Sequence, residues 1–249
     1  MLISVCMATY NGAKYLREQV DSILQQEFHD NRDVEMELVV SDDESTDDTV
    51  RILESYNDPR IKIFYHREHR KYRYFNGTRA CKCNFENAVR QAQGEYIFLS
   101  DQDDVWYPHK IDSQLTMLRK YGGVNCASFD MGDGNLKKTS QVIYPHDVPF
   151  FTFRTVSIYG FSMGFSREEL KYFLPFPNIS NGHDNYIQYS AIWRHRLSYI
   201  DEPCAIHRWT GVHNVSSFSS TASNQAPFLV KVFFRLYTYA SVIFRSYKS

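Results

Sequence analysis

Several features that would place a protein in a special class are missing from this 249-residue chain. It has no apolar stretch long enough to cross a bilayer, so no transmembrane helix is expected. Its five cysteines are odd in number and include no C-x-x-C pair, which argues against a disulfide framework or a zinc knuckle and favours reduced thiols in a cytosol. The formal net charge of −1 argues against a dedicated nucleic-acid binder.

The N-terminal run MLISVCMATYNG also lacks the features of a signal peptide. No positively charged residue precedes its apolar part, and the run is too short for an apolar core followed by a cleavage site. We interpret it as a first β-strand. Aromatic residues, at 16%, are plentiful, but composition does not distinguish a stacking site from an ordinary core.

Short apolar runs alternate with segments of helical periodicity in the first half of the chain. This alternation predicts an α/β fold whose mostly parallel sheet is flanked by helices. In such sheets, ligands bind beyond the carboxyl ends of the strands. The expected strands are 2–7, 37–40, 61–65 and 96–100, and the expected helices between them are 13–26, 50–56 and 84–93.

The second half is less regular. Helices are expected at 108–121, at 167–173 and from His183 to about His195, followed by a brief strand at 199–200 and a loop rich in His, Ser and Asn. A serine-rich segment, 217–227, is typical of a flexible linker. We therefore expect one domain over 1–216, and a linker with a C-terminal helix over 217–249.

The segment DQDD follows the apolar run at 96–99 and concentrates negative charge at the predicted sheet edge. Asp101 and Asp103 form an Asp-x-Asp pair, and in an extended chain side chains two positions apart point to the same side. Two such oxygen donors suit Mg²⁺ or Mn²⁺, which complete their shells with water and a substrate diphosphate. The alternative is a solvated turn or the acidic start of a helix.

Two further pairs of residues that include acids stand at element boundaries. Asp42 and Asp43 end the second predicted strand, where a carboxylate could bond a nucleobase or a ribose hydroxyl, or cap the following helix. His183 and Asp184 open a helix, where Asp184 could act as a general base or as another cap.

His207 and His213 could contact a phosphate or a metal, or be ordinary structural histidines. The run from His66 to Arg79 is too basic for a metal site and could hold phosphates, meet anionic lipid or be a solvated loop.

Six motifs together resemble the nucleotide-sugar glycosyltransferases of family 2, within their bacterial rhamnosyltransferase-like branch. They follow one another in family order over most of residues 2–216, and DQDDVW with its downstream Pro and Lys is the most specific. The motifs are VCMATYNGAKYLREQVDSILQQ, VVSDDESTDDT, NFENAVRQAQGEYIFLSDQDDVWYPHKI, GFSMGFSREELKYFLPFP, HDNYIQYSA and YIDEPCAIHRWTGVHNVS.

The resemblance implies the GT-A fold, which is Rossmann-like, and an inverting, metal-dependent transfer of a sugar from a nucleotide-diphosphate sugar. By this resemblance Asp184 is the general base, and Asp101, Asp103 and His213 are metal ligands. The nucleotide pocket would be lined by Ala8, Thr9, Tyr10, Asp42, Asp43 and Asp101. The donor and acceptor sugars would meet Asp104, Trp106, Gly160, Met163, Gly164 and His183.

The same resemblance suggests dTDP-rhamnose as the first donor to test, with a UDP-hexose as the alternative. The acceptor would be a lipid-linked glycan of a surface polysaccharide, such as O-antigen or capsule. The enzyme would then work in the cytoplasm at the inner face of the bacterial cell membrane. A non-catalytic nucleotide-binding scaffold of the same fold and a nucleic-acid binder are the competing classes, and the three intact acidic positions count against the scaffold.

The C-terminal segment 228–248 reads FLVKVFFRLYTYASVIFRSYK. Lys231, Arg235, Thr238 and Arg245 fall on one helical stripe, and aromatic and aliphatic residues cover the remainder. A basic stripe on an apolar helix suits a membrane interface. Packing on the domain or contact within a homodimer is the alternative.

Overall fold

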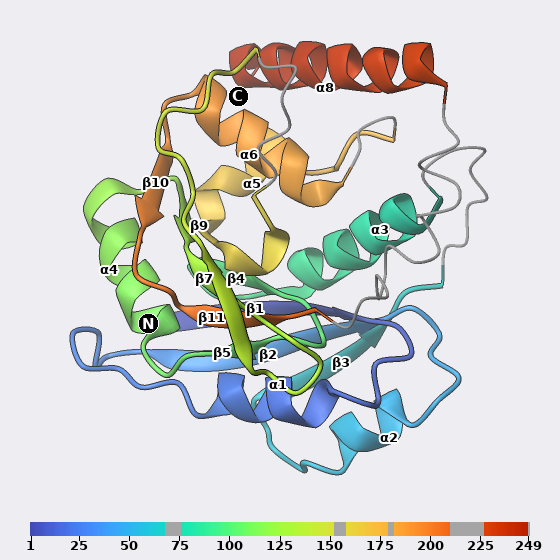
Figure 1. The fold of residues 1–249 in the computed structure, drawn as a ribbon, viewed down its shortest axis with the longest axis vertical. Helices are drawn as coiled ribbons and strands as arrows, with labels where there is room; N and C mark the ends of the chain where they lie inside the picture. The colour runs from blue at the N-terminus through green and yellow to red at the C-terminus, as the bar shows by residue number, and fades with distance from the viewer. Residues whose placement is uncertain (68–75, 152–157, 179–181, 210–226, 249) are drawn as a thin grey trace.

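The computed structural model describes residues 1–67, 76–151, 158–178, 182–209 and 227–248. Two sheets and their flanking helices make up this part of the chain (Figure 1). The larger sheet has seven strands in the order β10-β6-β9-β4-β1-β2-β3. These are β1 Leu2–Thr9, β2 Glu35–Asp42, β3 Ile61–Tyr65, β4 Tyr96–Ser100, β6 Val124–Ala127, β9 Met163–Ser166 and β10 Leu197–Ile200.

The large sheet is mostly parallel, as the alternation of strands and helices predicts. β1 pairs in parallel with β2 and β4, β2 with β3, and β6 with β10, whereas β9 runs antiparallel to β4 and β6. Ile3, Val5, Cys6 and Met7 of β1 are all fully buried, because helices cover both faces of a central parallel strand.

Helices α1 Leu16–Leu24 and α2 Thr49–Glu54 cover one face of the sheet, and α3 Asn76–Gln91 covers the other (Figure 1). The predicted helix at 84–93 is wrong at its start, because α3 already begins at Asn76. The helix predicted at 13–26 is shorter than expected, because a turn holds residues 12–15: the amides of Tyr15 and Leu16 both donate to the Gly12 carbonyl.

A second, four-stranded sheet in the order β5-β11-β7-β8 lies beside the first and corrects the expectation of an irregular second half. Its strands are β5 Val105–Trp106, β7 Phe129–Gly132, β8 Lys138–Val142 and β11 Ala205–Arg208. β5 directly follows the DQDD segment and pairs with β11, so this small sheet holds the end of that segment beside the strand that carries His207.

The remaining helices are α4 Lys110–Tyr121, α5 Leu170–Phe173, α6 His183–Trp193 and α8 Phe228–Lys248. α8 lies across α6 at the top of the view in Figure 1 and also contacts α5. The boundary at residue 216 between the domain and the linker that leads to the C-terminal helix stays a prediction, since the segment 210–226 lies outside the described residues. In the part of the chain that the structure describes, no helix is long and apolar enough to cross a membrane.

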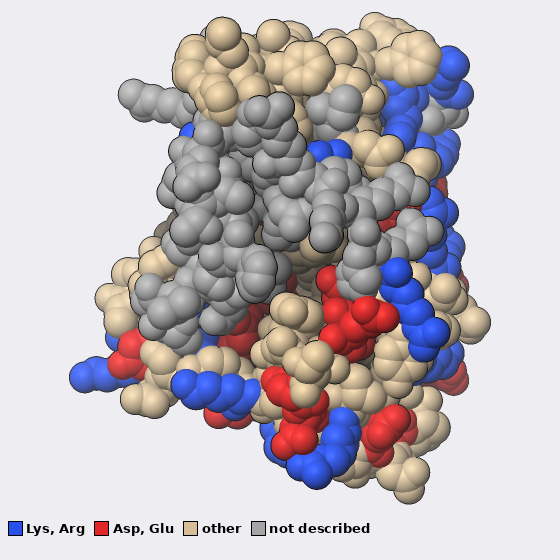
Figure 2. Space-filling view, turned by 90° about the vertical axis from the view of Figure 1, so that its right-hand side faces the viewer, with Lys and Arg blue, Asp and Glu red and all other residues tan. Residues whose placement is uncertain are grey.

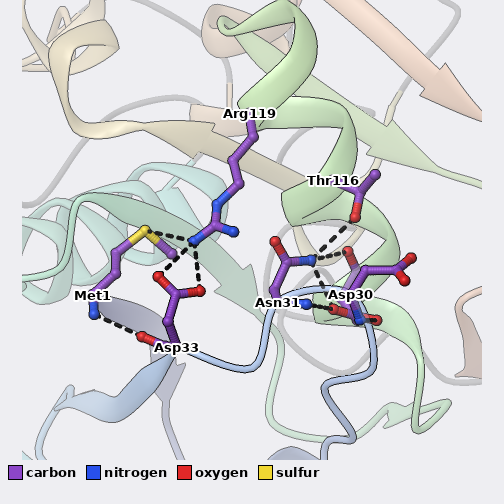
Figure 3. A network of polar contacts seen from close by, with 7 residues as sticks. Met1, Asp30, Asn31, Asp33, Thr116 and Arg119 are labelled. Carbon is purple, nitrogen blue, oxygen red and sulfur yellow. Dashed lines mark hydrogen bonds and ion pairs between the residues drawn. The ribbon is translucent and has the colours of Figure 1, made fainter.

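A network of polar contacts closes the amino-end side of the sheet (Figure 3). The Asn31 amide nitrogen donates to Asp112 at 2.7 Å and to Thr116 at 3.1 Å, and Arg119 pairs with Asp33 at 3.1 Å. Asp112 also accepts backbone N–H groups from the same loop, and together these bonds hold the pKa of its carboxyl below its usual range, although burial alone would raise it. Asp112 and Asp33, at this end of the sheet, therefore accept hydrogen bonds from N–H groups of the protein.

Candidate active site

The polar residues that end β1, β2 and β4 meet at the opposite, carboxyl edge of the sheet. The register pairs Thr9 of β1 with Asp42 of β2, and Met7 of β1 with Ser100 of β4. Because the strands are parallel and in step, the segments that follow them leave the sheet side by side. The acids after β2 and β4 therefore flank the Thr9-Tyr10 turn.

Asp42 accepts hydrogen bonds from neighbouring residues at the carboxyl edge of the sheet. It is fully buried, and Thr9 Oγ1 donates to its Oδ2 at 2.8 Å. The Ser45 amide donates to Oδ1 at 2.8 Å and the Ser45 hydroxyl to Oδ2 at 2.6 Å. Both oxygens are thus engaged, which suits a residue that shapes the pocket rather than one that binds a ligand directly.

Asp43 is the more accessible acid of this pair. Its Oδ1 lies 2.7 Å from Nδ1 of His66, the residue that follows β3. The His66 ring therefore orients the Asp43 carboxylate. The sequence had placed His66 only at the start of a basic run, most of which (68–75) lies outside the described residues.

Two amide side chains fix the turn after β1. Gln102 is buried, accepts the Tyr10 amide N–H at 2.9 Å and donates to the Tyr10 carbonyl at 3.0 Å. Asn84 of α3 donates to the Thr9 carbonyl at 3.1 Å. The Asp-rich segment is therefore bonded to the turn it faces, and both amides were missed because their partners are backbone groups far away in sequence.

Asp104 is the most deeply buried acid of the DQDD segment. Its Oδ1 accepts His207 Nδ1 at 2.6 Å and the Arg208 amide at 3.1 Å, whereas its buried Oδ2 has no hydrogen-bond partner among the described residues. The His207 ring stacks on Phe161, with centroids 5.1 Å apart. His207 thus connects the second sheet to the acidic cluster.

Electrostatic repulsion marks this cluster. Burial, and then the charges of Asp104 and Asp103, raise the pKa of the Asp101 carboxyl well above its usual range. Burial and the Asp104 charge raise the pKa of Asp103 to about 7. Burial would lower the pKa of His207, but the Asp104 charge and hydrogen bond, with the charges of Asp101 and Asp103, raise it to about 9. One imidazolium therefore faces three acids.

Arg208 adds a second cation behind the cluster. It is buried, and its Nε donates to the Asp103 carbonyl at 3.0 Å. Its other nitrogens bond the Gly134 carbonyl, at 2.6 Å, and the Glu18 carboxylate, and its guanidinium lies 4.2 Å from the centre of the Tyr15 ring. Arg208, itself held by these bonds, therefore fixes the position of the Asp103 backbone. No sequence signal beyond its position next to His207 pointed to this residue.

Asp184, at the start of α6, belongs to the same neighbourhood. Its charge contributes to the raised pKa of Asp101. Burial raises the pKa of the Cys81 thiol well above its usual value, and the charges of Asp101, Asp184 and Asp43 all add to this shift. Cys81 on α3 therefore lies within the field of three acids from three separate elements.

The carboxylate of Asp184 has one engaged and one open oxygen. Oδ1 accepts the Asn185 amide at 2.7 Å and the Asn185 side chain at 3.2 Å, whereas Oδ2 has no hydrogen bond from the described residues. His183 packs its ring on Phe85, with centroids 4.1 Å apart, and approaches Gly160 so closely that a Cβ there would lie 2.6 Å from its Nε2. Glycine at position 160 is what allows this contact.

Other predicted site residues lie in the core. Met163 is fully buried, and a Cβ on Gly164 would lie 2.6 Å from the Phe98 ring. Trp106 is 2% exposed and stacks under the Lys110 ammonium, 4.8 Å from the ring centre. Ala8, within β1, is half-buried. Their roles toward a substrate stay predictions.

The cluster fits a divalent cation. Asp101 and Asp103 supply oxygen donors whose pKa values are raised by burial and then by the neighbouring acids, and a bound cation would favour their charged forms. Among the described residues there is no group of three or more His, Cys, Asp or Glu side chains arranged to hold a metal. His213, the third predicted ligand, lies outside them. Remaining ligands would have to come from a substrate diphosphate and water.

A mostly parallel sheet whose carboxyl edge gathers acids beside a helix-borne carboxylate fits the GT-A fold of glycosyltransferases, and comparison with known proteins gives the family. Residues 4–174 match the family model described as "Glycosyl transferase family 2". The chain belongs to glycosyl transferase family 2.

Similar curated proteins are bacterial glycosyltransferases. An uncharacterized glycosyltransferase of Rickettsia typhi is 33% identical over 119 residues, which is 48% of this chain and 32% of that protein. The dTDP-rhamnosyl transferase RfbG of Shigella flexneri is 34% identical over 49% of this chain and 39% of its own length. WfgD of Escherichia coli, a UDP-Glc:α-D-GlcNAc-diphosphoundecaprenol β-1,3-glucosyltransferase, is 28% identical over 57% and 49%. The matches thus span a third to a half of these relatives.

Solved structures support the fold. TarS of S. aureus in complex with UDP superposes with a TM-score of 0.63 at 21% identity, covering 100% of this chain and 72% of that one. The mannosyltransferase PcManGT of Pyrobaculum calidifontis, in complex with GDP-Man and Mn²⁺, gives 0.59 at 15% identity, covering 98% and 73%.

Proposed function

We propose that this protein transfers a sugar, with inversion, from a nucleotide-diphosphate sugar to a lipid-linked glycan during bacterial surface polysaccharide synthesis, of the O-antigen or capsule kind. The observation that carries the proposal is the convergence of Asp43, Asp101 and Asp184 around Cys81 at the carboxyl edge of the sheet. The nucleotide, the diphosphate and the acceptor of such a reaction would each need one carboxylate, and these three acids come from three separate elements.

Asp184 would act as the general base. Its Oδ1 is held by Asn185, which leaves Oδ2 to accept the proton of an acceptor hydroxyl as that oxygen attacks the anomeric carbon. The C–O bond to the nucleoside diphosphate breaks on the opposite side of the sugar ring. A single displacement of this kind inverts the anomeric centre.

Asp101 and Asp103 would hold Mn²⁺ or Mg²⁺, which neutralises the diphosphate as it leaves. Protonated His207 faces the same acids and adds to the positive charge at this edge. Asp43, oriented by His66, would accept a base N–H, while Thr9 and Tyr10 would line the nucleoside pocket.

For the donor, dTDP-rhamnose is the first choice, because the motifs resemble rhamnosyltransferases and a relative carries that name. A UDP-hexose is the second choice, and the name of WfgD supports it as well as a lipid diphosphate acceptor. A lipid-linked acceptor would place the protein in the cytoplasm, at the inner face of the cell membrane.

A thermal-shift panel of nucleotide sugars with Mn²⁺ tests the donor, because a ligand that binds only the folded state raises the melting temperature by mass action. We expect the true donor to raise it with Mn²⁺ and far less with EDTA. Release of the nucleoside diphosphate by the same donor must then follow. A panel in which a donor binds but none is ever turned over, even with lipid-linked acceptors, would favour the non-catalytic scaffold.

A further inference from the structure

Helix α8 is mixed in polarity on the side that faces the protein. Phe234, Thr238 and Val242 are buried there. The Ser241 hydroxyl lies 3.2 Å from the Tyr186 hydroxyl, and the Arg245 guanidinium lies over the same ring. The polar stripe expected from the sequence is therefore turned partly inward, because Thr238 and Arg245 face α6 rather than solvent.

The outward side of α8 is apolar. Leu229, Phe233, Leu236, Phe244 and Tyr247 are 77%, 54%, 57%, 61% and 81% exposed. Their spacing of three, four and eight residues places them on one face of the helix. Figure 2 shows the upper end of the molecule, where α8 lies in Figure 1, as mostly uncharged surface, with Asp and Glu gathered mainly in the lower half. A continuous exposed stripe of this kind marks an interaction surface.

Charge identifies the partner. The 21 residues of α8 include no Asp or Glu, but they include Lys231, Arg235, Arg245 and Lys248. Lys231 and Lys248, near the two ends of the helix, are exposed. Two copies packed through the apolar stripe would leave these cations without an acid from either helix. An anionic lipid surface instead accepts the apolar stripe together with the exposed cations near the two helix ends.

We propose that α8 lies flat on an anionic bilayer, with Leu229, Phe233, Leu236 and Phe244 inserted among the acyl chains and Lys231 and Lys248 at the headgroups. Its length of about 30 Å, at 1.5 Å per residue, would provide a long contact line. The inference rests on the proposed function for its biological purpose, since that function places the acceptor in the membrane.

The test is sedimentation of the full chain with vesicles of phosphatidylcholine, alone or mixed with an equal part of phosphatidylglycerol. The triple variant Phe233→Gln, Leu236→Gln, Phe244→Gln should lower the vesicle partition coefficient at least about tenfold. The pair Lys231→Gln, Lys248→Gln should lower it roughly tenfold on anionic vesicles and leave binding to neutral vesicles unchanged.

A matched control removes apolar residues of similar exposure outside α8. Tyr121→Gln with Ile143→Gln, which are 51% and 57% exposed in wild type, should leave vesicle binding unchanged. Circular dichroism confirms that each variant is folded, and sedimentation equilibrium follows the oligomeric state. A dimer that the triple variant dissociates, with no vesicle binding by wild type, would overturn the proposal in favour of a second copy.

Equal vesicle binding by wild type and the triple variant would also overturn it. Donor binding, measured in the same variants without vesicles, should stay at the wild-type level, since none of these residues belongs to the acidic cluster. Failure of membrane docking is therefore distinguishable from failure of the proposed function, which would show as absence of any donor binding in wild type.

Discussion

The carboxyl edge of the sheet and the outward face of α8 depart from ordinary globular design in opposite ways. At the sheet edge, the carboxyl side chains of Asp103 and Asp104 are buried, and at α8 aromatic and aliphatic side chains are exposed. Each arrangement lowers the stability of the isolated chain. We propose that a partner offsets each cost: a cation with a diphosphate at the edge, and an anionic bilayer at the helix.

The amino-end network sharpens this contrast. Asp112 is as buried as Asp103, yet it accepts several N–H groups, and its pKa is lowered rather than raised. Burial raises the pKa of both carboxyls, but the Asp104 charge adds to the rise at Asp103, whereas hydrogen bonds reverse it at Asp112. We therefore expect Asp112 to serve the fold and Asp103 to serve the proposed cation site.

The largest expected effect comes from Asp184→Asn. The amide is similar in size but cannot take a proton from the acceptor, so the transfer rate should fall roughly 10²–10⁴-fold. Donor affinity, measured by calorimetry, should stay close to wild type. A variant with the wild-type transfer rate would remove Asp184 from the role of base.

Asp103→Asn should lower metal-dependent donor binding and turnover while stabilising the free protein. Burial and then the Asp104 charge disfavour the ionised Asp103 carboxyl, and the neutral amide removes both costs, so at pH 8 the free energy of unfolding should rise by about 1–3 kcal/mol. Urea unfolding without metal measures this change.

Asp112→Asn is the matched control for Asp103→Asn. Because the charged form of Asp112 is stabilised by its donors, the same substitution should lower the free energy of unfolding by about 1–3 kcal/mol. Changes of the same sign in both variants would mean that the two acids are not in contrasting environments.

The two sides of α8 provide the next test. Val242→Ala on the buried side should lower the free energy of unfolding by about 1–3 kcal/mol, because it leaves a small cavity against the domain. Phe244→Ala on the outward side should change it by less than about 0.5 kcal/mol. Thermal melts without lipid compare the two, and equal losses would show that the outward face is packed in solution.

The sequence predicted those helices and strands whose apolar residues follow a regular helical or strand spacing. The strand at 96–100 and the helix at 228–248 match the structure at both ends, since each is a run of one pattern bounded by clear breaks. The second sheet was missed because its strands have two to five residues, and β8, KTSQV, is largely exposed and polar. So short a strand is defined by its partner, not by its own sequence.

The candidate site divides in the same way. The acids were predictable because they interrupt apolar strands, but the residues that orient them were not. Gln102 bonds Tyr10 across 92 positions, and Asn84 bonds Thr9 across 75. Amides that bond a distant backbone carry no local pattern, so only the fold reveals them.

The smallest predicted effect is a pH dependence that the acidic cluster imposes. His207 has a folded pKa of about 9, above the roughly 6.5 of an unfolded histidine. Its stabilising charge is therefore complete below about pH 6.5 and is lost as the pH rises toward 9. Asp103, with a folded pKa of about 7, adds to the same fall near neutrality, because its ionised form is disfavoured.

Other groups set the limits of the useful window. Burial lowers the pKa of His183, so below pH 6.5 this residue makes stability rise with pH and opposes the fall caused by His207. Burial lowers the pKa values of Lys82 and Lys110 to about 8, so above pH 8 these residues oppose the same fall. Between pH 6.5 and 8 the free energy of unfolding should fall by about 1 kcal/mol, as followed by urea unfolding. His207→Gln should flatten this slope, because glutamine carries no charge to lose. A wild-type stability that rises over this window would show that the cluster does not hold His207 as an imidazolium, and the contrast between the sheet edge and α8 would then lose its electrostatic basis.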